Sequence, residues 1–141
     1  MARRSHVLAP LVVAVAVALA VTGCRFGADE PDEPDPAVFC EDHATIDANF
    51  ASLPNDTLAA LRDGVARLAE DTEGLAGRAP DDIAEETEAL AAGLRQASDA
   101  VAEAPTLEVA RAEVAAVVDE GAYQRASAAV DTWVADNCAS G

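Results

Sequence analysis

The fold class is decided by the stretch NDTLAALRDGVARLAEDTEGLA, residues 55–76. Its apolar residues recur at intervals of three and four and never alternate for long, which is the pattern of a helix with one buried face. That face carries Leu58, Leu61, Val65, Leu68 and Leu75. The stretch therefore predicts an amphipathic helix and an all-α protein.

The same spacing continues on both sides of this stretch. A second stripe follows it, a third lies near the end of the chain, and a shorter one comes before it. The second stripe contains Ile83, Thr87, Leu90, Leu94, Ala97 and Val101. The third contains Leu107, Ala110, Val114, Val117, Val130, Trp133 and Val134. The shorter first one contains Val38, Phe39, Ile46 and Phe50.

Prolines divide the pattern into separate helices. Breaks fall at Leu53-Pro54, at 77–80 and at 104–106, because a helix accepts proline at its start but not inside. The predicted fold is a small antiparallel four-helix bundle with helices at 36–52, 55–76, 80–103 and 106–138. Asp119-Glu120-Gly121 could also end one helix and begin another, so a break near Gly121 stays open.

The first 23 residues have the pattern of an export signal. Arg3 and Arg4 precede the uncharged run Val7–Thr22, which is shorter than the roughly 20 residues that a membrane-spanning helix needs. Val21-Thr22-Gly23-Cys24 then resembles the lipobox of bacterial lipoproteins. The resemblance implies cleavage before Cys24, a lipid on its sulfur and anchoring on the outer face of the cell membrane. An ordinary secretory signal that leaves Cys24 as a spare thiol is the alternative.

Residues 24–36 contain three prolines and five acids and almost nothing apolar. Such a segment cannot bury enough surface to fold, and its prolines and like charges keep it extended. The chain is thus predicted to comprise a signal peptide at 1–23, a lipidated N-terminus with an acidic tether at 24–36, and a helical domain at 37–141.

Once Cys24 is assigned to the lipid by that resemblance, Cys40 and Cys138 remain as the only possible pair. Outside the cytoplasm such a pair normally oxidises. Cys40 lies at the start of the first predicted helix and Cys138 at the end of the fourth, and an even number of antiparallel helices brings these two ends together. We expect a disulfide, with two free thiols as the alternative.

The charge of the chain excludes some partners. The formal charge is −17, and removal of Arg3 and Arg4 with the signal peptide makes it −17 − 2 = −19. So acidic a domain offers no basic face for the phosphates of nucleic acid. It also repels anionic lipid head groups, so we expect membrane contact through the lipid on Cys24 alone.

His43 is the one histidine that lies beyond the signal peptide. Together with Asp47 and with Glu41 or Asp42 it could begin a metal site, since His43 and Asp47 share a helix face. No second histidine or free thiol completes a transition-metal set, so we interpret these residues as a solvated helix face and predict no metal site.

The remaining polar groups do not indicate catalysis. The acids at 81, 82, 85, 86 and 88 favour the start of a helix through its dipole and are interpreted as solvated. No catalytic motif is present, and no histidine is available to activate Ser52, Ser98 or Ser127. We therefore predict no enzyme, no catalytic residue and no cofactor. Tyr123 and Trp133 could form a binding patch, but packing against the short first helix is the simpler interpretation.

The segment Tyr123–Cys138, with Phe39-Cys40 and residues 79–83 (APDDI), resembles a group of small alanine-rich exported helical proteins of actinobacteria. That group has no assigned activity, so the resemblance supports the fold and the disulfide and implies no functional residue. The architecture favours a membrane-tethered, non-enzymatic module that interacts with an envelope protein. An envelope protein that binds a small ligand or a metal ion is the alternative.

Overall fold

The computed structural model describes residues 34–138, so the predicted signal peptide, lipobox and Cys24 lie outside the described residues. Its elements are α1 (Pro36–Ala51), α2 (Leu58–Ala76), the 3₁₀ turn η1 (Asp81–Ile83), α3 (Ala84–Glu103), α4 (Leu107–Val118) and α5 (Gly121–Asn137). This confirms the predicted all-α class, since residues 34–138 contain no strand. None of the helices in this range is both long enough and apolar enough to cross a membrane.

Three of the α-helices in the described residues begin at a side-chain cap, and α2 and α3 begin at Leu58 and Ala84, a few residues later than the predicted starts at 55 and 80. Pro36 is the first residue of α1, and the Asp35 carboxylate accepts a hydrogen bond from the amide of Ala37 at 2.9 Å. Thr57 and Thr106 cap α2 and α4 in the same way through their hydroxyl oxygens. Such caps satisfy amides that have no partner within the helix, so each start is fixed by local chemistry.

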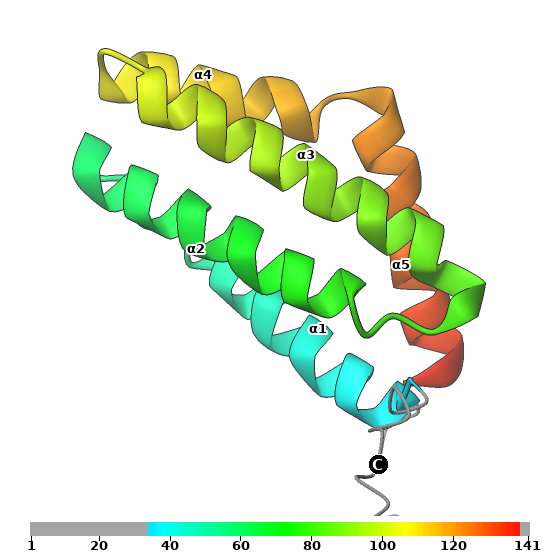
Figure 1. Ribbon diagram of the computed structural model, residues 1–141. Helices are drawn as coiled ribbons and strands as arrows, with labels where there is room; N and C mark the ends of the chain where they lie inside the picture. The colour runs from blue at the N-terminus through cyan, green and yellow to red at the C-terminus, as the bar shows by residue number, and fades with distance from the viewer. Residues whose placement is uncertain (1–33, 139–141) are drawn as a thin grey trace, which may run out of the picture. The chain divides into compact units, whose positions relative to one another are not determined.

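The predicted count of four helices is wrong, because the segment 106–138 is two helices. Asp119 ends α4, and Glu120 has an extended backbone with φ −65° and ψ 130°, from which α5 begins at Gly121. The structure thus has the break near Gly121 that the sequence analysis gave as an alternative to one continuous helix. It changes the direction of the chain, so α5 does not continue along α3 as α4 does (Figure 1).

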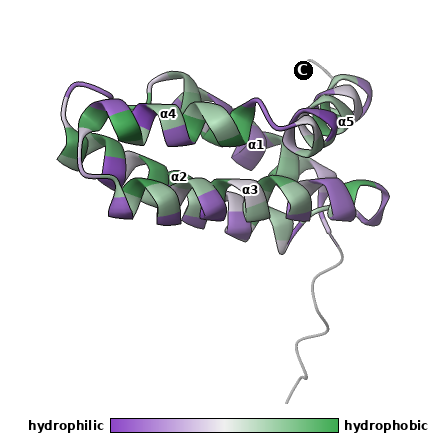
Figure 2. Ribbon diagram, turned by 90° about the horizontal axis from the view of Figure 1, so that it is seen from above, coloured by the Kyte–Doolittle hydropathy of each residue, from purple (hydrophilic) through white to green (hydrophobic). Residues whose placement is uncertain are grey.

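Helices α2 and α3 form an antiparallel pair at the centre of the domain and make its most extensive contact. Helix α1 runs along α2, while α4 runs along α3 (Figure 1). Seen from above, α4 and α5 lie over one side of the α2–α3 pair (Figure 2). Helix α5 packs against α3 and η1, and it ends beside the start of α1 (Figure 1).

The core consists of three clusters of buried residues. One cluster around Phe39 and Val130 lies near the start of α1, and a second around Leu61 and Val101 joins α2, α3 and α4. A small third cluster contains Leu68, Ala69 and Leu94. Tyr123 packs against all three. The predicted stripes of α2 and α3 account for about half of these residues, and alanine, which contributes little apolar area, is frequent among the rest.

Polar groups also join the helices. The guanidinium of Arg62 on α2 donates from Nε to the carbonyl of Val101 at 3.1 Å and from Nη2 to that of Ala104 at 2.7 Å. These carbonyls lie at the end of α3, where a helix leaves its last acceptors unpaired. An ion pair between Glu73 and Arg95 also links α2 to α3.

The two ends of the described domain meet at Cys40 and Cys138. Their sulfur atoms lie at bonding distance, and their Cα atoms are 5.6 Å apart, which is usual for a disulfide. The geometry is that of the predicted pair. The predicted parity of four antiparallel helices does not produce it, however, since α5 reaches α1 by crossing the end of the domain (Figure 1).

Candidate functional site

Helix α1 has one apolar stripe, and the stripe is covered at only one end. Phe39, at its start, is 0% exposed, whereas Phe50, near its end, is 36% exposed. Ile46 lies between them and is half-buried. Val38, which the sequence also assigned to the buried stripe, is 43% exposed, so that assignment is wrong. Val38 directly precedes Phe39, so a helix cannot place both side chains on the same face.

The first half of α1 is attached at three points. The Phe39 ring meets the edge of the Trp133 ring with centroids 5.3 Å apart and planes at 83°. Cys40 is joined to Cys138. Oδ2 of Asp42 lies 3.0 Å from Nη2 of Arg78. This oxygen is buried and accepts no hydrogen bond, so the ion pair with Arg78 compensates its charge. Trp133 thus packs against the first helix, as predicted.

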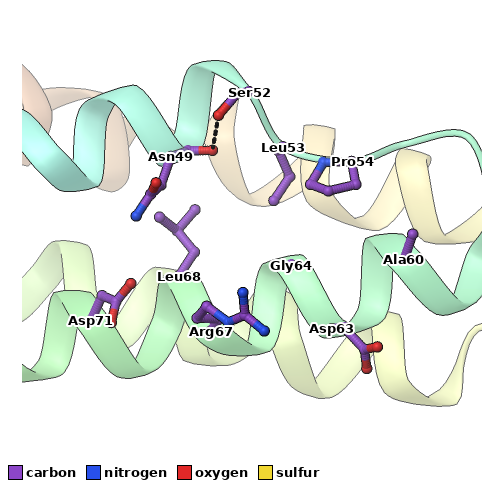
Figure 3. A pocket seen from close by; sticks show the side chains of 10 residues that line it. All are labelled: Asn49, Ser52, Leu53, Pro54, Ala60, Asp63, Gly64, Arg67, Leu68 and Asp71. Carbon is purple, nitrogen blue, oxygen red and sulfur yellow. Dashed lines mark hydrogen bonds between the residues drawn. The ribbon is translucent and has the colours of Figure 1, made fainter.

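The second half of α1 lies between two openings. The first, the α1–α2 groove, has a volume of about 400 Å³ (Figure 3). Figure 3 shows Leu68 directed from α2 toward α1, with Arg67 extending along α2 toward Gly64. The groove is lined by Asn49, Ser52, Leu53, Pro54, Ala60, Asp63, Gly64, Arg67, Leu68 and Asp71.

Gly64 determines the shape of this groove. A Cβ atom at Gly64 would lie 2.9 Å from Cδ1 of Leu53 and 3.2 Å from Cδ of Pro54, which is closer than side chains normally approach. The missing side chain therefore lets the α1–α2 connection rest directly on the backbone of α2. Leu53 and Pro54 form part of the groove wall, across from Gly64 (Figure 3).

The second opening, the five-helix pocket, is lined by other residues of α1 and has a volume of about 200 Å³. Every α-helix of the described domain contributes to it. Its walls are His43, Ile46, Asp47 and Phe50 from α1; Leu68, Thr72 and Leu75 from α2; Leu90 and Leu94 from α3; Val118 from α4; and Tyr123, Ser127 and Asp131 from α5.

The pocket combines an apolar floor with a polar rim. Leu68, Leu75 and Leu94 are nearly or fully buried, and the Thr72 hydroxyl donates to the carbonyl of Leu68 at 2.8 Å, so the floor holds no unpaired hydroxyl. Asp47 and Asp131 on the rim are exposed. Burial, and then the nearby charge of Asp131, raises the pKa of Tyr123 above its ordinary value of 10.0. Tyr123 therefore remains a neutral hydroxyl at physiological pH.

The residues considered for a metal site are not brought together. His43 and Asp47 both line the five-helix pocket, and the His43 ring stacks on Phe39 with centroids 6.2 Å apart. Asp42 pairs with Arg78 instead, and Glu41 is exposed. Within residues 34–138, no group of three or more His, Cys, Asp and Glu side chains is placed to hold a metal ion.

The acidic patch lies away from both openings. Asp81 and Asp82 belong to η1, and Glu85 and Glu86 occupy the first turn of α3. Of the patch, only Glu86 is half-buried. Ser52 donates its hydroxyl to the carbonyl of Ala48. Ser127 and His43 line the same pocket. A catalytic serine needs a direct hydrogen bond to its base, and sharing a pocket does not provide one.

The sequence did not identify the five-helix pocket, although it contained one indication of it. Gly93 lies inside α3, where glycine costs about 1 kcal/mol relative to alanine, so a close approach is the usual reason for it. In the structure a Cβ at Gly93 would lie 2.7 Å from Cδ2 of Tyr123. The glycine therefore allows the Tyr123 ring to enter between the helices, where it forms a wall of the pocket.

Comparison of the chain with protein-family models, with curated proteins and with solved structures gives no significant match.

Proposed function

We propose that this protein is a lipid-anchored, non-enzymatic binding module on the outer face of a membrane and that it holds a segment of an envelope protein in the α1–α2 groove. The observation that carries the proposal is the open groove of about 400 Å³ between the second half of α1 and α2. Its apolar walls are Leu53, Pro54 and Leu68, and α1 contributes the polar side chain of Asn49. A groove of this kind is suited to a partner side chain.

The charges of the groove favour a basic partner. Asp63 and Asp71 flank Arg67 along α2, so acids outnumber the single arginine in the lining. The domain around the groove is strongly acidic as well. Complementary charge accelerates association and discriminates against acidic competitors. The expected partner segment places an apolar side chain against Leu53 and Pro54 and a lysine or arginine beside Asp63 or Asp71.

The proposed anchor and tether place the groove within reach of other envelope proteins. Lipidation of Cys24 fixes the chain at the membrane, since two or more acyl chains anchor stably where one does not. An extended segment at 25–36 spans up to roughly 35 Å at about 3.1 Å per residue. The module can therefore meet a partner that projects from the membrane surface as well as one within it.

Mild crosslinking in a host of the native type, followed by affinity capture from the envelope and mass spectrometry, tests the proposal. The informative variant is Asp63→Lys with Asp71→Lys, because both side chains are exposed and reversal of their charge leaves the core intact. The matched control is Glu85→Lys with Glu88→Lys, which changes the net charge equally at exposed positions on α3. We expect one protein to be captured by the wild type and by the control and to be lost from the groove variant.

Capture that is equal for both variants would show that the groove is not the binding surface. The same spectra report the mass of Cys24. A diacylglyceryl modification is expected, and an unmodified thiol would refute the proposed anchor without bearing on the groove.

A further inference from the structure

The five-helix pocket is separate from the proposed groove. The two openings are lined by different residues of α1 and share one lining residue, Leu68. The pocket therefore requires its own explanation, and its walls differ in chemistry from those of the groove.

The floor of the pocket fits a small apolar group. Its volume is about 200 Å³, and an apolar cavity of about 150 Å³ is large enough for benzene. The floor is formed by leucine side chains from α2 and α3, among them Leu68, Leu90 and Leu94. A single ring or a short branched chain would fill this space, whereas a nucleotide or a sugar chain would not.

The rim selects the charge of the occupant. Asp47 projects from α1 and Asp131 from α5, so carboxylates from two different helices border one opening. Neither belongs to the ion pairs found within residues 34–138, which join Asp42 to Arg78 and Glu73 to Arg95. His43 is the only basic side chain in the lining, and its ring is stacked on Phe39. Tyr123 and Ser127 add hydroxyl groups to the wall of α5.

We propose that the five-helix pocket binds a small organic cation with an apolar body about the size of one ring and a single ammonium group. The body lies on the leucines of α2 and α3, where its burial supplies the attraction. The ammonium group stays at the mouth between Asp47 and Asp131, where it keeps part of its hydration and gains the attraction of both carboxylates. Protonated Tyr123 can accept a hydrogen bond from the ammonium group.

The test uses the full chain in lipid nanodiscs, labelled at the leucine methyl groups for two-dimensional NMR. Benzylamine is the probe, and benzoate is its counterpart of similar size and opposite charge. Benzylamine should shift the methyl signals of Leu68, Leu75, Leu90 and Leu94, which line the pocket, and leave those of Leu61 and Leu107, which do not. Benzoate should shift none of them at the same concentration.

Two sets of variants locate the binding. Asp47→Asn with Asp131→Asn should weaken benzylamine binding by about fivefold for each carboxylate removed. A fivefold change is the upper end of the effect expected for the loss of one exposed ion pair. The control, Asp99→Asn with Asp136→Asn, changes the net charge equally at exposed positions outside the pocket and should change binding by less than about twofold. Ser127→Leu fills the pocket from α5 and should abolish the methyl shifts.

Three results would overturn the proposal: shifts of the same size with benzoate, equal weakening in the two double variants, or shifts spread over leucines outside the pocket. The asparagine variants keep the core unchanged, so they remain informative even if Ser127→Leu does not fold. None of these results depends on the α1–α2 groove or on Cys24.

Discussion

The two phenylalanines of α1 occupy the same stripe of one helix and have opposite surroundings. Phe39 is enclosed by the core and by Trp133, whereas Phe50 borders the five-helix pocket and is 36% exposed. The difference does not come from the pattern of the helix, because both residues fit the same helical spacing. It comes from what lies opposite: α5 covers the start of α1, and nothing among the described residues fully covers its end.

The comparison shows two ways of holding a helix. Helix α2 is held along its length by a regular stripe that packs on α3, while α1 is held in its first half by an aromatic pair, a disulfide and an ion pair and near its middle by Ile46. Attachment at a few points leaves the rest of a helix available, and both openings lie beside that free half. The contrast is open to test by substitution and by titration.

The disulfide should contribute most to the attachment of α1. Cys40 and Cys138 are 98 residues apart, and closure of a loop of about 100 residues contributes on the order of 4–5 kcal/mol in the chain-entropy model. Cys40→Ser with Cys138→Ser should lower the free energy of unfolding by a comparable amount, measured by urea denaturation. Amide exchange should rise more in α1 than in the α2–α3 pair. An unchanged midpoint would show that packing alone holds the helix.

Alanine at each phenylalanine tests the two halves of α1 directly. Phe39→Ala should cost about 3–5 kcal/mol, since it empties a fully enclosed site. Phe50→Ala removes a partly exposed ring and should cost no more than about 1 kcal/mol. Chemical denaturation of both variants gives the comparison, and equal losses would contradict the view that only the first half is firmly packed.

Two helical glycines test how closely the helices approach. In Gly93→Ala the new methyl group would lie 2.7 Å from Cδ2 of Tyr123, so overpacking should cost about 1–3 kcal/mol. In Gly74→Ala the nearest atom is Nη2 of Arg78 at 3.7 Å, so better helix propensity should stabilise by up to about 1 kcal/mol. Thermal melts should therefore shift in opposite directions, and a shift in the same direction would exclude the close packing of Tyr123.

The titration of Tyr123 gives the smallest and most local test. The chain has one tyrosine, so its ultraviolet difference spectrum reports this side chain alone. Burial and Asp131 raise the pKa of Tyr123, and Asp131→Asn should lower that pKa without bringing it fully back to its ordinary value, because the larger cause remains.

The same shift sets a pH dependence for stability. Because the folded pKa of Tyr123 lies above the unfolded value of 10.0, its contribution is complete below about pH 10 and is lost as the pH rises through the folded pKa. Stability that increases above pH 10 would contradict the burial of this ring.

Much of the fold was predictable because its signals are local. The breaks at Leu53-Pro54, at 77–80 and at 104–106 and the stripes of α2 and α3 each depend on residues close together in the chain, so the sequence shows them directly. The break at Gly121 could be seen but not decided. Whether the helix breaks there depends on whether the following segment packs better along α3 or across the end of the domain. That choice is made by contacts with residues distant in the sequence.

The openings were not predictable for a related reason. The five-helix pocket combines residues from His43 to Asp131, and their meeting depends on the path of α5 after Glu120. No spacing in the sequence encodes that path. The uncovered end of α1 was also hidden, because Phe50 has the same helical spacing as Phe39 and only the position of α5 distinguishes them.

The Cys40–Cys138 bond also has a consequence for survival among proteases. It makes every described helix from Cys40 onward part of one covalent ring. A protease that cuts any single connection inside the ring, for example the one between α2 and α3, opens the ring but releases no fragment. Both new ends stay linked to the chain before Cys40. A nicked molecule would thus keep its helices beside one another, and only a second cut could remove a piece.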